Sequence, residues 1–346
     1  MANISDEIYM QRAFDLALKG AGKVSPNPMV GAVLVHEGTI IGEGYHQQYG
    51  GPHAEVNAVR SVKQEQQQFI ADSTMYVSLE PCCIYGKTPP CTNLILKNGI
   101  KRVVIASQDK TPGVFGQSRK ILKEAGVEVH FGVLQATGDQ ISKIRNIFVE
   151  ENRPYVILKY ARNQHGFIGE VDQQVWISNN YSKRLVHRWR GEVDAILVGT
   201  NTVLIDNPRL TNRHYFGKQP LRIILDRQLR IPTSAYVFDE STPTLILTAM
   251  AITPPPKDNV EYVTIDFTAL AKQLFELAYQ RNLSTLMIEG GAQILQYFAA
   301  NNAWNEARVF TGSQSIKNGI PAPNLQRRPT HTFDIAGDRL EIYFNA

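Results

Sequence analysis

The chain has 346 residues, which is too long for one ordinary core and fits two domains of common size. Hydrophobic residues make up 43% and charged residues 20%, a balance that argues against a disordered chain. The formal net charge of +4 comes without a dense run of Lys or Arg, so the sequence predicts no nucleic-acid partner and suits small phosphorylated molecules.

The beginning of the chain predicts a helix rather than a targeting segment. Asp6 and Glu7 stand where a signal peptide would be basic, and apolar residues recur at helical spacing. No stretch of the sequence approaches the roughly 18 apolar residues that span a bilayer. We therefore expect a cytoplasmic protein with no membrane partner. The three cysteines, Cys82, Cys83 and Cys91, lie close together, which indicates a metal site rather than disulfides.

The first half of the chain alternates short apolar runs with helical patterns, which predicts an α/β layer. Glu37-Gly38 between the first two apolar runs is a hairpin signal, so part of the sheet should be antiparallel. The polar residues 63–68 are expected to be a solvated helix end. The expected strands are 29–36, 39–44, 74–79, 102–106 and 127–131, and the expected helices are 6–19, 53–63, 91–98 and 117–125.

A domain boundary is expected at residues 150–154, where the chain becomes charged and then reaches Pro154. The two domains then cover residues 1–150 and 153–346. The second half alternates again without repeating the first, which predicts a different α/β domain. Its expected strands are 155–160, 194–199, 221–226, 243–248, 284–288 and 339–344, and its expected helices are 179–190, 267–281 and 291–300.

His53, Cys82 and Cys91 are the residue types that ligate a catalytic zinc. One imidazole and two thiolates leave a fourth position open for water, whose pKa zinc lowers to about 7. Glu55, two residues after His53, is placed to act as a general acid/base without binding the metal. A histidine and a glutamate in this spacing, followed by cysteines, are typical of zinc deaminases, which predicts one Zn²⁺ per chain.

The same residues allow two alternatives to a small-molecule deaminase. A closed structural zinc site would use Cys83 as a fourth ligand, but adjacent Cys82 and Cys83 side chains diverge, and the position of Glu55 would go unexplained. A deaminase that edits nucleic acids would show a basic, aromatic strand-binding face and a short cysteine spacing. Here eight residues separate Cys82 from Cys91, and the sequence shows no such face.

The long cysteine loop resembles the deaminase domain of the bifunctional riboflavin-biosynthesis family. The loop of that family ends in G-[RK]-T-P-P-C, as residues 86–91 do. Residues 25–33 (SPNPMVGAV) and 42–46 (GEGYH) resemble two further segments of the family. The resemblance implies a cytidine-deaminase-like fold, which is a mixed sheet with helices on both faces.

The same resemblance implies that Asn27, His46 and Lys87 contact the substrate of the deaminase. The alternative is a purely structural role, in which proline and glycine in these segments only shape turns before strands. One position departs from the family, because Ile84 stands where the family has a histidine two residues after its first ligand cysteine.

Residues 193–213 resemble the reductase domain of the same family, which reads G-x-x-T-V-x-x-D-[ND]-P-x-L-T-x-R. The resemblance implies a dihydrofolate-reductase-like α/β fold that uses NADPH. Every fixed position of the pattern matches: Gly199, Thr202, Val203, Asp206, Asn207, Pro208, Leu210, Thr211 and Arg213.

Glu289-Gly290-Gly291, between an apolar strand and a helix, forms a phosphate site in this interpretation. Glycines let the backbone approach a ligand, and free amides at a helix N-terminus favour anions. Asn163 and His165 stand where the family has serine and aspartate. By resemblance, the cofactor contacts are Ala161, Trp176, Thr202, Asp206, Arg227 and Gly291, and the substrate contacts are Gln174, Arg190, Leu210, Arg213 and Glu289.

Arg227 carries a specific expectation about the choice of cofactor. It follows an apolar strand, and cofactors of α/β domains lie against the carboxyl ends of strands, where an arginine can pair with the 2′-phosphate of NADPH. The alternative is an exposed arginine that only caps a turn.

Together these features predict a bifunctional enzyme of riboflavin biosynthesis. The first domain would hydrolyse the 2-amino group of 2,5-diamino-6-(5-phosphoribosylamino)pyrimidin-4(3H)-one. The second would reduce the ribosyl group of 5-amino-6-(5-phosphoribosylamino)uracil to ribityl with NADPH, which supplies the hydride. Two alternatives remain open: a deaminase with a degenerate reductase domain, and a non-catalytic regulator that binds zinc and nucleotide. Homo-oligomerisation is also left open.

Overall fold

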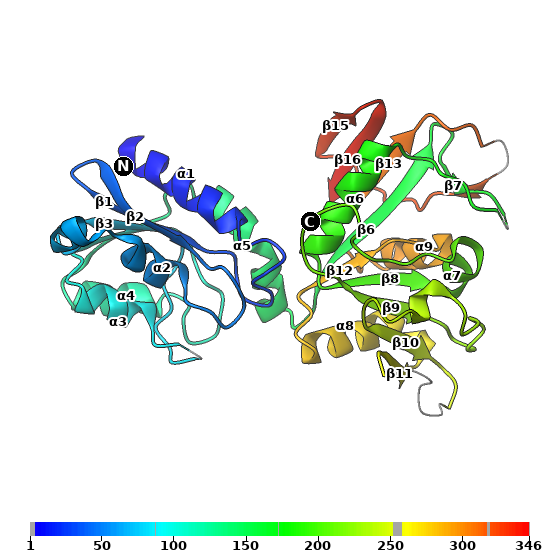
Figure 1. The fold of residues 1–346 in the computed structure, drawn as a ribbon, viewed down its shortest axis with the longest axis horizontal. Coiled ribbons are helices and arrows are strands. Elements are labelled where there is room, and N and C mark those ends of the chain that lie inside the picture. The colour runs from blue at the N-terminus through cyan, green and yellow to red at the C-terminus, as the bar shows by residue number, and fades with distance from the viewer. Residues whose placement is uncertain (1–3, 87, 172, 252–257, 317–318, 346) are drawn as a thin grey trace. The chain divides into compact units, whose positions relative to one another are not determined.

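The computed structural model describes residues 4–86, 88–171, 173–251, 258–316 and 319–345 (Figure 1). The chain divides into two compact units, residues 1–153 and 154–346. Each unit is an α/β layer with buried apolar residues of its own, so the predicted fold class is confirmed. Within the described ranges, none of the helices combines the length and the hydropathy that crossing a lipid bilayer requires.

The described residues of the first unit form a five-stranded sheet in the order β2 (Thr39–Tyr45), β1 (Gly31–His36), β3 (Thr74–Leu79), β4 (Arg102–Ser107) and β5 (Glu128–Phe131). β1 pairs antiparallel with β2 and β3, whereas β3, β4 and β5 run parallel. The predicted hairpin is confirmed at Glu37 and Gly38, which both have positive φ as a two-residue type I′ turn requires. The sheet is therefore mixed, as expected.

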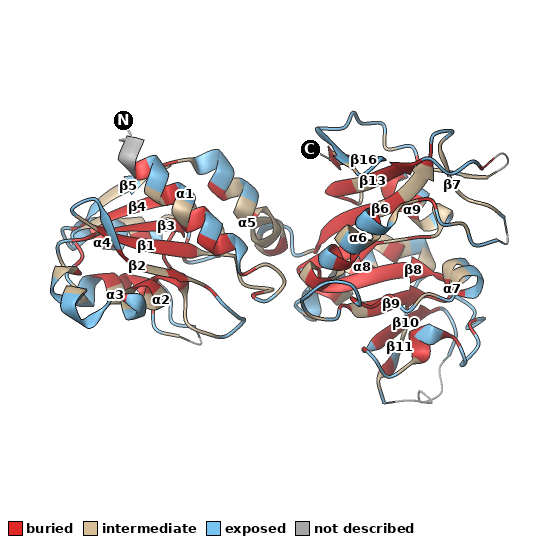
Figure 2. Ribbon diagram, turned by 45° about the horizontal axis from the view of Figure 1, so that its top comes forward, coloured by how far each residue is buried: buried red, intermediate tan, exposed pale blue. Residues whose placement is uncertain are grey.

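The helices of the first unit are α1 (Ile4–Leu18), α2 (Ala54–Ser61), α3 (Cys91–Lys97), α4 (Gln117–Glu124) and α5 (Gln135–Glu150). They cover both faces of the sheet, because successive strand residues point to opposite sides and both sides are apolar. Leu34 and Ile105 pack on the side of α2, α3 and α4, and Val33 and Val104 on the side of α1 and α5. Figure 2 shows the resulting buried strands and exposed outer helix faces.

The described residues of the second unit form a nine-stranded sheet. Its strands in order are β11 (Val260–Thr264), β10 (Thr244–Thr248), β9 (Leu221–Leu225), β8 (Ala195–Gly199), β12 (Thr285–Ile288), β6 (Tyr155–Asn163), β13 (Glu306–Gly312), β16 (Asp338–Phe344) and β15 (His331–Ile335). From β11 through β13 in this spatial order, each strand runs parallel to its neighbours. β16 then pairs antiparallel with β13 and with β15. β7 (Phe167–Gly169) and β14 (Ile320–Pro321) form a separate pair.

The helices of the second unit are α6 (Asn180–Glu192), α7 (Thr200–Asp206), α8 (Leu270–Gln280) and α9 (Ala292–Ala300). Leu274 of α8 and Phe298 of α9 pack on one face of the sheet with Leu158 and Leu197. On the other face, the Trp189 ring of α6 lies 5.5 Å from the ring of Phe310. The carboxyl ends of the parallel strands meet at one edge, where ligands of such sheets bind.

Each strand and helix predicted from the sequence is present in the described residues with small shifts of its ends, but several elements were missed. The helix predicted at 53–63 ends at Ser61, since Val62 is extended, and the polar residues after it form a separate 3-10 helix, Gln64–Phe69. The helix predicted at 267–281 begins as a 3-10 turn. The missed α-helices and strands are α5, α7, β7, β11, β13, β14 and β15, and the 3-10 helix Tyr236–Phe238 was missed too.

Candidate active sites

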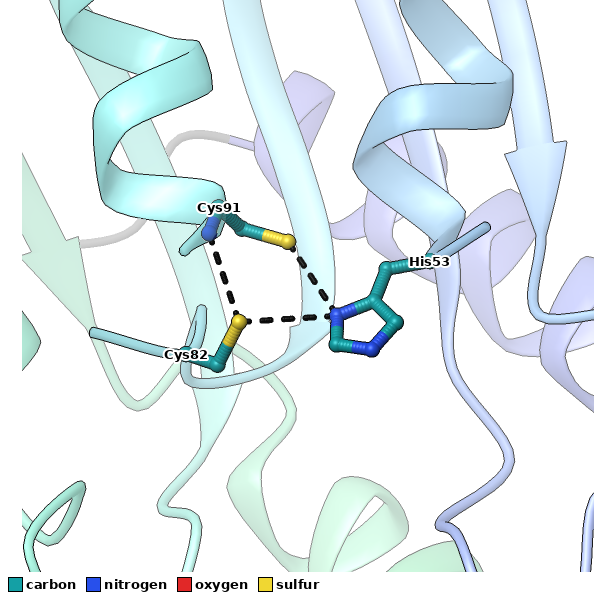
Figure 3. A group of neighbouring side chains, drawn as sticks. All are labelled: His53, Cys82 and Cys91. Carbon is teal, nitrogen blue, oxygen red and sulfur yellow. Dashed lines mark hydrogen bonds between the residues drawn. The ribbon is translucent and has the colours of Figure 1, made fainter. Parts of the chain in front are cut away.

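The side chains of His53, Cys82 and Cys91 converge in the first unit. His53 directly precedes α2 at its N-terminus, Cys91 is the first residue of α3, and Cys82 lies in the loop after β3. The Sγ atoms of Cys82 and Cys91 lie 3.5 and 3.3 Å from His53 Nδ1 (Figure 3). In a tetrahedral zinc site, bond lengths of about 2.3 Å to sulfur and about 2.1 Å to nitrogen give an N···S separation of roughly 3.6 Å. The donor types and their spacing therefore fit Zn²⁺.

The surroundings of these donors favour the charge state that a metal needs. A hydrogen bond with the Cys91 thiol, followed in weight by one with His53, lowers the pKa of Cys82 to about 5. The backbone N–H of Cys91 also donates to Cys82 Sγ at 3.3 Å. Metal binding requires the thiolate. On the outer side of His53, Thr88 Oγ1 lies 3.4 Å from Nε2, a contact that orients the ring.

Cys83 lies outside this group of ligands. Its thiol donates instead to the carbonyl of Gly113 at 3.4 Å. The described donors that could hold a metal together are His53, Cys82 and Cys91, with ligand atoms within 4.8 Å of one another. This arrangement argues against a closed site with four protein ligands and leaves room for a water.

Glu55 stands in the first turn of α2 beside these ligands. It is 3% exposed, and burial, followed by the nearby Cys82, raises the pKa of its carboxyl. It lines a pocket of about 280 Å³ together with His53 and Cys82. A buried carboxyl with a raised pKa beside the metal ligands is suited to carry a proton.

Asn27 and His46 line the same pocket and contact each other. His46 Nδ1 lies 3.0 Å from the carbonyl of Pro52, so Nδ1 carries the hydrogen that is donated there. Its Nε2 then accepts from Asn27 Nδ2 at 3.1 Å. Burial lowers the pKa of His46, which keeps this neutral tautomer. Lys87, the third substrate contact expected in the deaminase, lies outside the described residues.

Further residues of this pocket were missed from the sequence. Those with polar side chains include Glu80, Asp109, Thr111 and Arg145. Glu80 accepts from the backbone N–H of Gly116 at 3.1 Å and from Ser118 Oγ at 2.9 Å, so it caps α4 from the segment that leads to Cys82. Its position directly before Pro81-Cys82 was an available signal. Ile84 also lines the pocket, with an exposed fraction of 42%.

In the second unit, Arg190 and Glu289 form the centre of a buried polar group. Arg190 donates through Nε and Nη2 to the two carboxylate oxygens of Glu289, both at 2.7 Å. Its Nη1 donates to the carbonyl of Thr211 at 3.1 Å, and Arg213 donates to Thr211 Oγ1 at 2.9 Å. Leu210 adjoins this segment and is buried with a positive φ. Four expected substrate residues therefore lie close together.

Lys159 belongs to the same group and was missed from the sequence. Its Nζ lies 3.8 Å from Glu289 Oε2, and burial lowers the pKa of its ammonium. Arg190 and Lys159 outweigh the burial of Glu289 and lower its pKa to about 2. A lysine inside the otherwise apolar run YVILKYA was the available signal.

Two of the expected cofactor residues, Thr202 and Gly291, lie against each other. A Cβ built on Gly291 would stand 3.5 Å from Thr202 Oγ1, and one on Gly290 would stand 3.3 Å from it. Gly291 has a φ of 68° and precedes α9, so its conformation favours glycine. Asp206 ends α7, and burial raises its pKa.

Other expected reductase residues are not gathered around this group. Trp176 is 62% exposed and lies under the ammonium of Lys183, and Gln174 is exposed. Arg227 is exposed after β9, 5.8 Å from the ring of Phe267. Ala161 lies near the carboxyl end of β6. Among the described residues, no hydrogen bond or ion pair joins their side chains to Arg190 or Glu289.

Asn163 and His165, the two residues near the end of β6 that depart from the family pattern, differ in their structural roles. Asn163 is 1% exposed, and its Oδ1 accepts from the backbone N–H groups of His165 and Phe167, both at 3.0 Å. Its Nδ2 donates to the carbonyl of Ile316 at 3.2 Å. Asn163 therefore closes the β6–β7 turn, whereas His165 is an exposed residue of that turn.

Comparison with known proteins gives two domain matches. Residues 3–107 match the cytidine and deoxycytidylate deaminase zinc-binding region, and residues 154–315 match the RibD C-terminal domain. The chain is 36% identical over 329 residues to the riboflavin biosynthesis protein RibD of Aquifex aeolicus, a match that covers 92% of this chain and 90% of that protein.

Solved structures extend the similarity to the whole fold. A diaminohydroxyphosphoribosylaminopyrimidine deaminase/5-amino-6-(5-phosphoribosylamino)uracil reductase from Thermotoga maritima is 32% identical, with a TM-score of 0.91 and coverage of 99% of both chains. RibD of Acinetobacter baumannii is 28% identical, with a TM-score of 0.88 and the same coverage. The predictions of a cytidine-deaminase-like unit, a dihydrofolate-reductase-like unit, zinc and NADPH are confirmed. The chain belongs to the RibD family of bifunctional, zinc- and NADPH-dependent enzymes of riboflavin biosynthesis.

Proposed function

We propose that residues 1–150 deaminate 2,5-diamino-6-(5-phosphoribosylamino)pyrimidin-4(3H)-one and that residues 153–346 reduce the deaminated product with NADPH. The convergence of His53, Cys82 and Cys91 beside buried Glu55 in one pocket carries this proposal. The substrate assignment is supported by the named activity of the similar protein from Thermotoga maritima.

In the deaminase, zinc held by His53, Cys82 and Cys91 supplies Lewis-acid activation of water at neutral pH. Glu55 accepts a proton from the attacking water and returns it to the departing amino group. Water and the amidine are thereby converted to a carbonyl and ammonia. Asn27 and His46 present a fixed pair of polar groups to the pyrimidine, because the Pro52 carbonyl sets the tautomer of His46. Lys87 completes the substrate contacts.

In the reductase, NADPH supplies the hydride for C1′ of the ribosyl group. Glu289, held as an anion by Arg190, and Arg213 orient the substrate together with Leu210 and Gln174. Burial lowers the pKa of Lys159, and we assign to its ammonium the donation of the proton that the sugar takes up as it opens. The cofactor is assigned to the carboxyl edge of the parallel strands, with contacts from Ala161, Trp176, Thr202, Asp206, Arg227 and Gly291.

The setting of these reactions follows from their chemistry. The substrates are small phosphorylated molecules, so no nucleic acid or membrane is needed as a partner, and the cytoplasm, which supplies NADPH and keeps thiols reduced, is the proposed location.

Two assays on the purified full chain test the proposal. Without NADPH, the diaminopyrimidine substrate should release one ammonia and accumulate the deaminated ribosyl product. Addition of NADPH should then convert that product to the ribityl compound, with one NADPH oxidised for each. Ammonia release without NADPH oxidation would leave a deaminase with a degenerate reductase. The absence of both reactions from zinc-loaded protein would favour the non-catalytic regulator.

A further inference from the structure

The charges that line the deaminase pocket are unfavourable for a phosphorylated substrate. Glu55, Glu80 and Asp109 contribute carboxyl groups to the wall, and Arg145 contributes the guanidinium among the described lining residues. Carboxylates repel a phosphate dianion, and the repulsion is stronger in a partly enclosed pocket than in water. A phosphate that enters this pocket therefore requires a cation where it comes to rest.

Arg145 is held at the pocket by the packing of α5. Gly138, Ser142 and Arg145 follow one another at helical spacing on one face of this helix. Gly138 lies so close to β4 that a Cβ on it would stand 2.9 Å from the Cβ of Ser107, and Ser142 is 2% exposed. The same face that fixes α5 to the sheet therefore directs Arg145 into the lining of the pocket.

The guanidinium joins the two loops that form this part of the pocket. Its Nη1 donates to the carbonyl of Pro26 at 3.3 Å, and its Nη2 donates to Thr111 Oγ1 at 3.1 Å. These contacts fix the position of the guanidinium before a ligand arrives. A guanidinium fixed in this way is preorganised for phosphate, whose oxygens match its planar set of donors.

A chain of contacts leads from Arg145 to the metal ligands. Asn27, next to the Pro26 carbonyl that Arg145 binds, contacts His46 at 3.1 Å. The His46 ring in turn lies 5.5 Å from the ring of His53. Asn27 and His46, the expected contacts of the pyrimidine, thus lie between the metal ligands and Arg145. The pyrimidine and the phosphate of the substrate follow one another in the same order.

We propose that Arg145 binds the phosphate of the deaminase substrate and makes the pocket selective for the phosphorylated pyrimidine over its dephosphorylated form. This inference rests on the proposed function, and it assigns phosphate recognition within that same site. Arg145 acts on binding and takes no part in proton transfer, so its loss should affect KM more than kcat.

Arg145→Gln tests this assignment with two substrates, the phosphorylated diaminopyrimidine and the same compound after removal of the phosphate. For the phosphorylated compound, kcat/KM should fall about tenfold to a hundredfold, the range of one charge-assisted contact. For the dephosphorylated compound it should change less than about threefold. Arg145→Lys keeps the positive charge but loses the planar set of guanidinium donors, so its kcat/KM for the phosphorylated compound should lie between those of wild type and Arg145→Gln. This variant replaces Arg145→Gln in the test if the glutamine variant fails to fold.

Lys110→Gln is the matched control. It removes a positive charge from the neighbouring loop, where Lys110 pairs with Glu150 at 3.2 Å outside the pocket lining, and should leave the preference for the phosphorylated compound unchanged. Equal losses on both substrates in Arg145→Gln would overturn the proposal and assign the residue a purely structural role. A wild-type enzyme that deaminates both compounds equally well would overturn it too. Failure of wild type to deaminate either compound would instead contradict the proposed function.

Discussion

Each unit contains a buried glutamate at its candidate site, and the two are surrounded in opposite ways. Glu55 has burial and Cys82 against its charge, so its pKa is raised. The Glu289 side chain is also largely buried, with an exposed fraction of 5%, yet Arg190 and Lys159 outweigh this burial and lower its pKa to about 2. A carboxyl in the first environment exchanges protons readily, whereas one in the second remains a fixed anion. The same residue type is therefore suited to proton transfer in one unit and to orientation of a substrate in the other.

The two sites also differ in how completely the protein assembles them. The expected zinc ligands have their donor atoms within 4.8 Å of one another, as donors to a single metal ion must. The residues expected around NADPH are spread over the carboxyl ends of several strands, and Trp176 and Arg227 remain exposed. A dinucleotide is long, so the groups that bind it need not contact each other. Convergence of the expected side chains is thus a strict test of the zinc site and a weak test of the NADPH site.

The largest expected effect removes a zinc ligand. Cys82→Ser and Cys91→Ser should each abolish stoichiometric zinc binding and deamination, because two remaining protein ligands hold the metal poorly. Cys83→Ser, the matched control, should retain one zinc per chain, since its thiol binds the Gly113 carbonyl instead. Elemental analysis of the purified variants checks this. Zinc lost from Cys83→Ser but kept in Cys82→Ser would show that the ligands have been assigned wrongly.

Glu55→Gln sharpens the comparison of the two glutamates. The amide keeps the shape of the side chain but cannot shuttle a proton, so deamination should fall about 100-fold to 10,000-fold while zinc remains bound. Reduction of the separately supplied deaminated product should be unchanged and serves as the control within the same chain. Near-normal ammonia release by the zinc-loaded variant would rule out Glu55 as the proton carrier.

The sequence predicted the first site well because its chemistry is local. The ligands and Glu55 lie in two short segments, and their types alone limit the metal. Arg145 could not be found in this way, since it lies on α5, whose residues are mostly polar and include Gly138. α5 is stabilised by close packing against β4, a tertiary effect that overrides the weak helical signal of its sequence.

The second unit was harder to predict for a related reason. β13 pairs with β6, which is distant in the sequence, and β11 is a five-residue strand at the edge of the sheet, so local patterns indicate them poorly. Lys159 lies within a predicted strand and was not singled out, because its contact with Glu289 appears only when β6 and β12 are paired. Asn163 departs from the family pattern, yet it closes a turn with its own hydrogen bonds, which the sequence alone does not show.

Acid should destabilise the second unit through Glu289. Its pKa is lowered from 4.5 to about 2, so it contributes stability that is fully present above about pH 4.5 and is lost as the pH falls towards 2. The shift corresponds to about 3 kcal/mol of unfolding free energy. Trp176, Trp189 and Trp304 all belong to the second unit, so tryptophan fluorescence during urea unfolding follows this unit alone.

Glu289→Gln should remove most of this acid dependence and lower stability at pH 7, because Arg190 is left buried without its partner. Glu261→Gln, which breaks an exposed pair with Arg281, is the control and should cost less than about 1 kcal/mol. An unchanged slope of stability between pH 4.5 and 2 in Glu289→Gln would show that other carboxyl groups dominate the acid response.

The smallest expected effect concerns Arg227 and the choice between NADPH and NADH. Arg227 follows β9 at the carboxyl edge of the sheet, where it is exposed and lies 5.8 Å from the ring of Phe267. An exposed charge-assisted contact lies at the low end of its energy range, so Arg227→Ala should reduce the ratio of kcat/KM for NADPH over NADH by about tenfold. NADH turnover should barely change, because NADH lacks the 2′-phosphate. Arg230→Ala, a nearby exposed arginine, is the control and should keep the wild-type ratio. Equal ratios in wild type and Arg227→Ala would remove Arg227 from the cofactor site, and the search for the phosphate contact would move to the segment around Thr202 and Gly291, whose side chain and backbone already lie together.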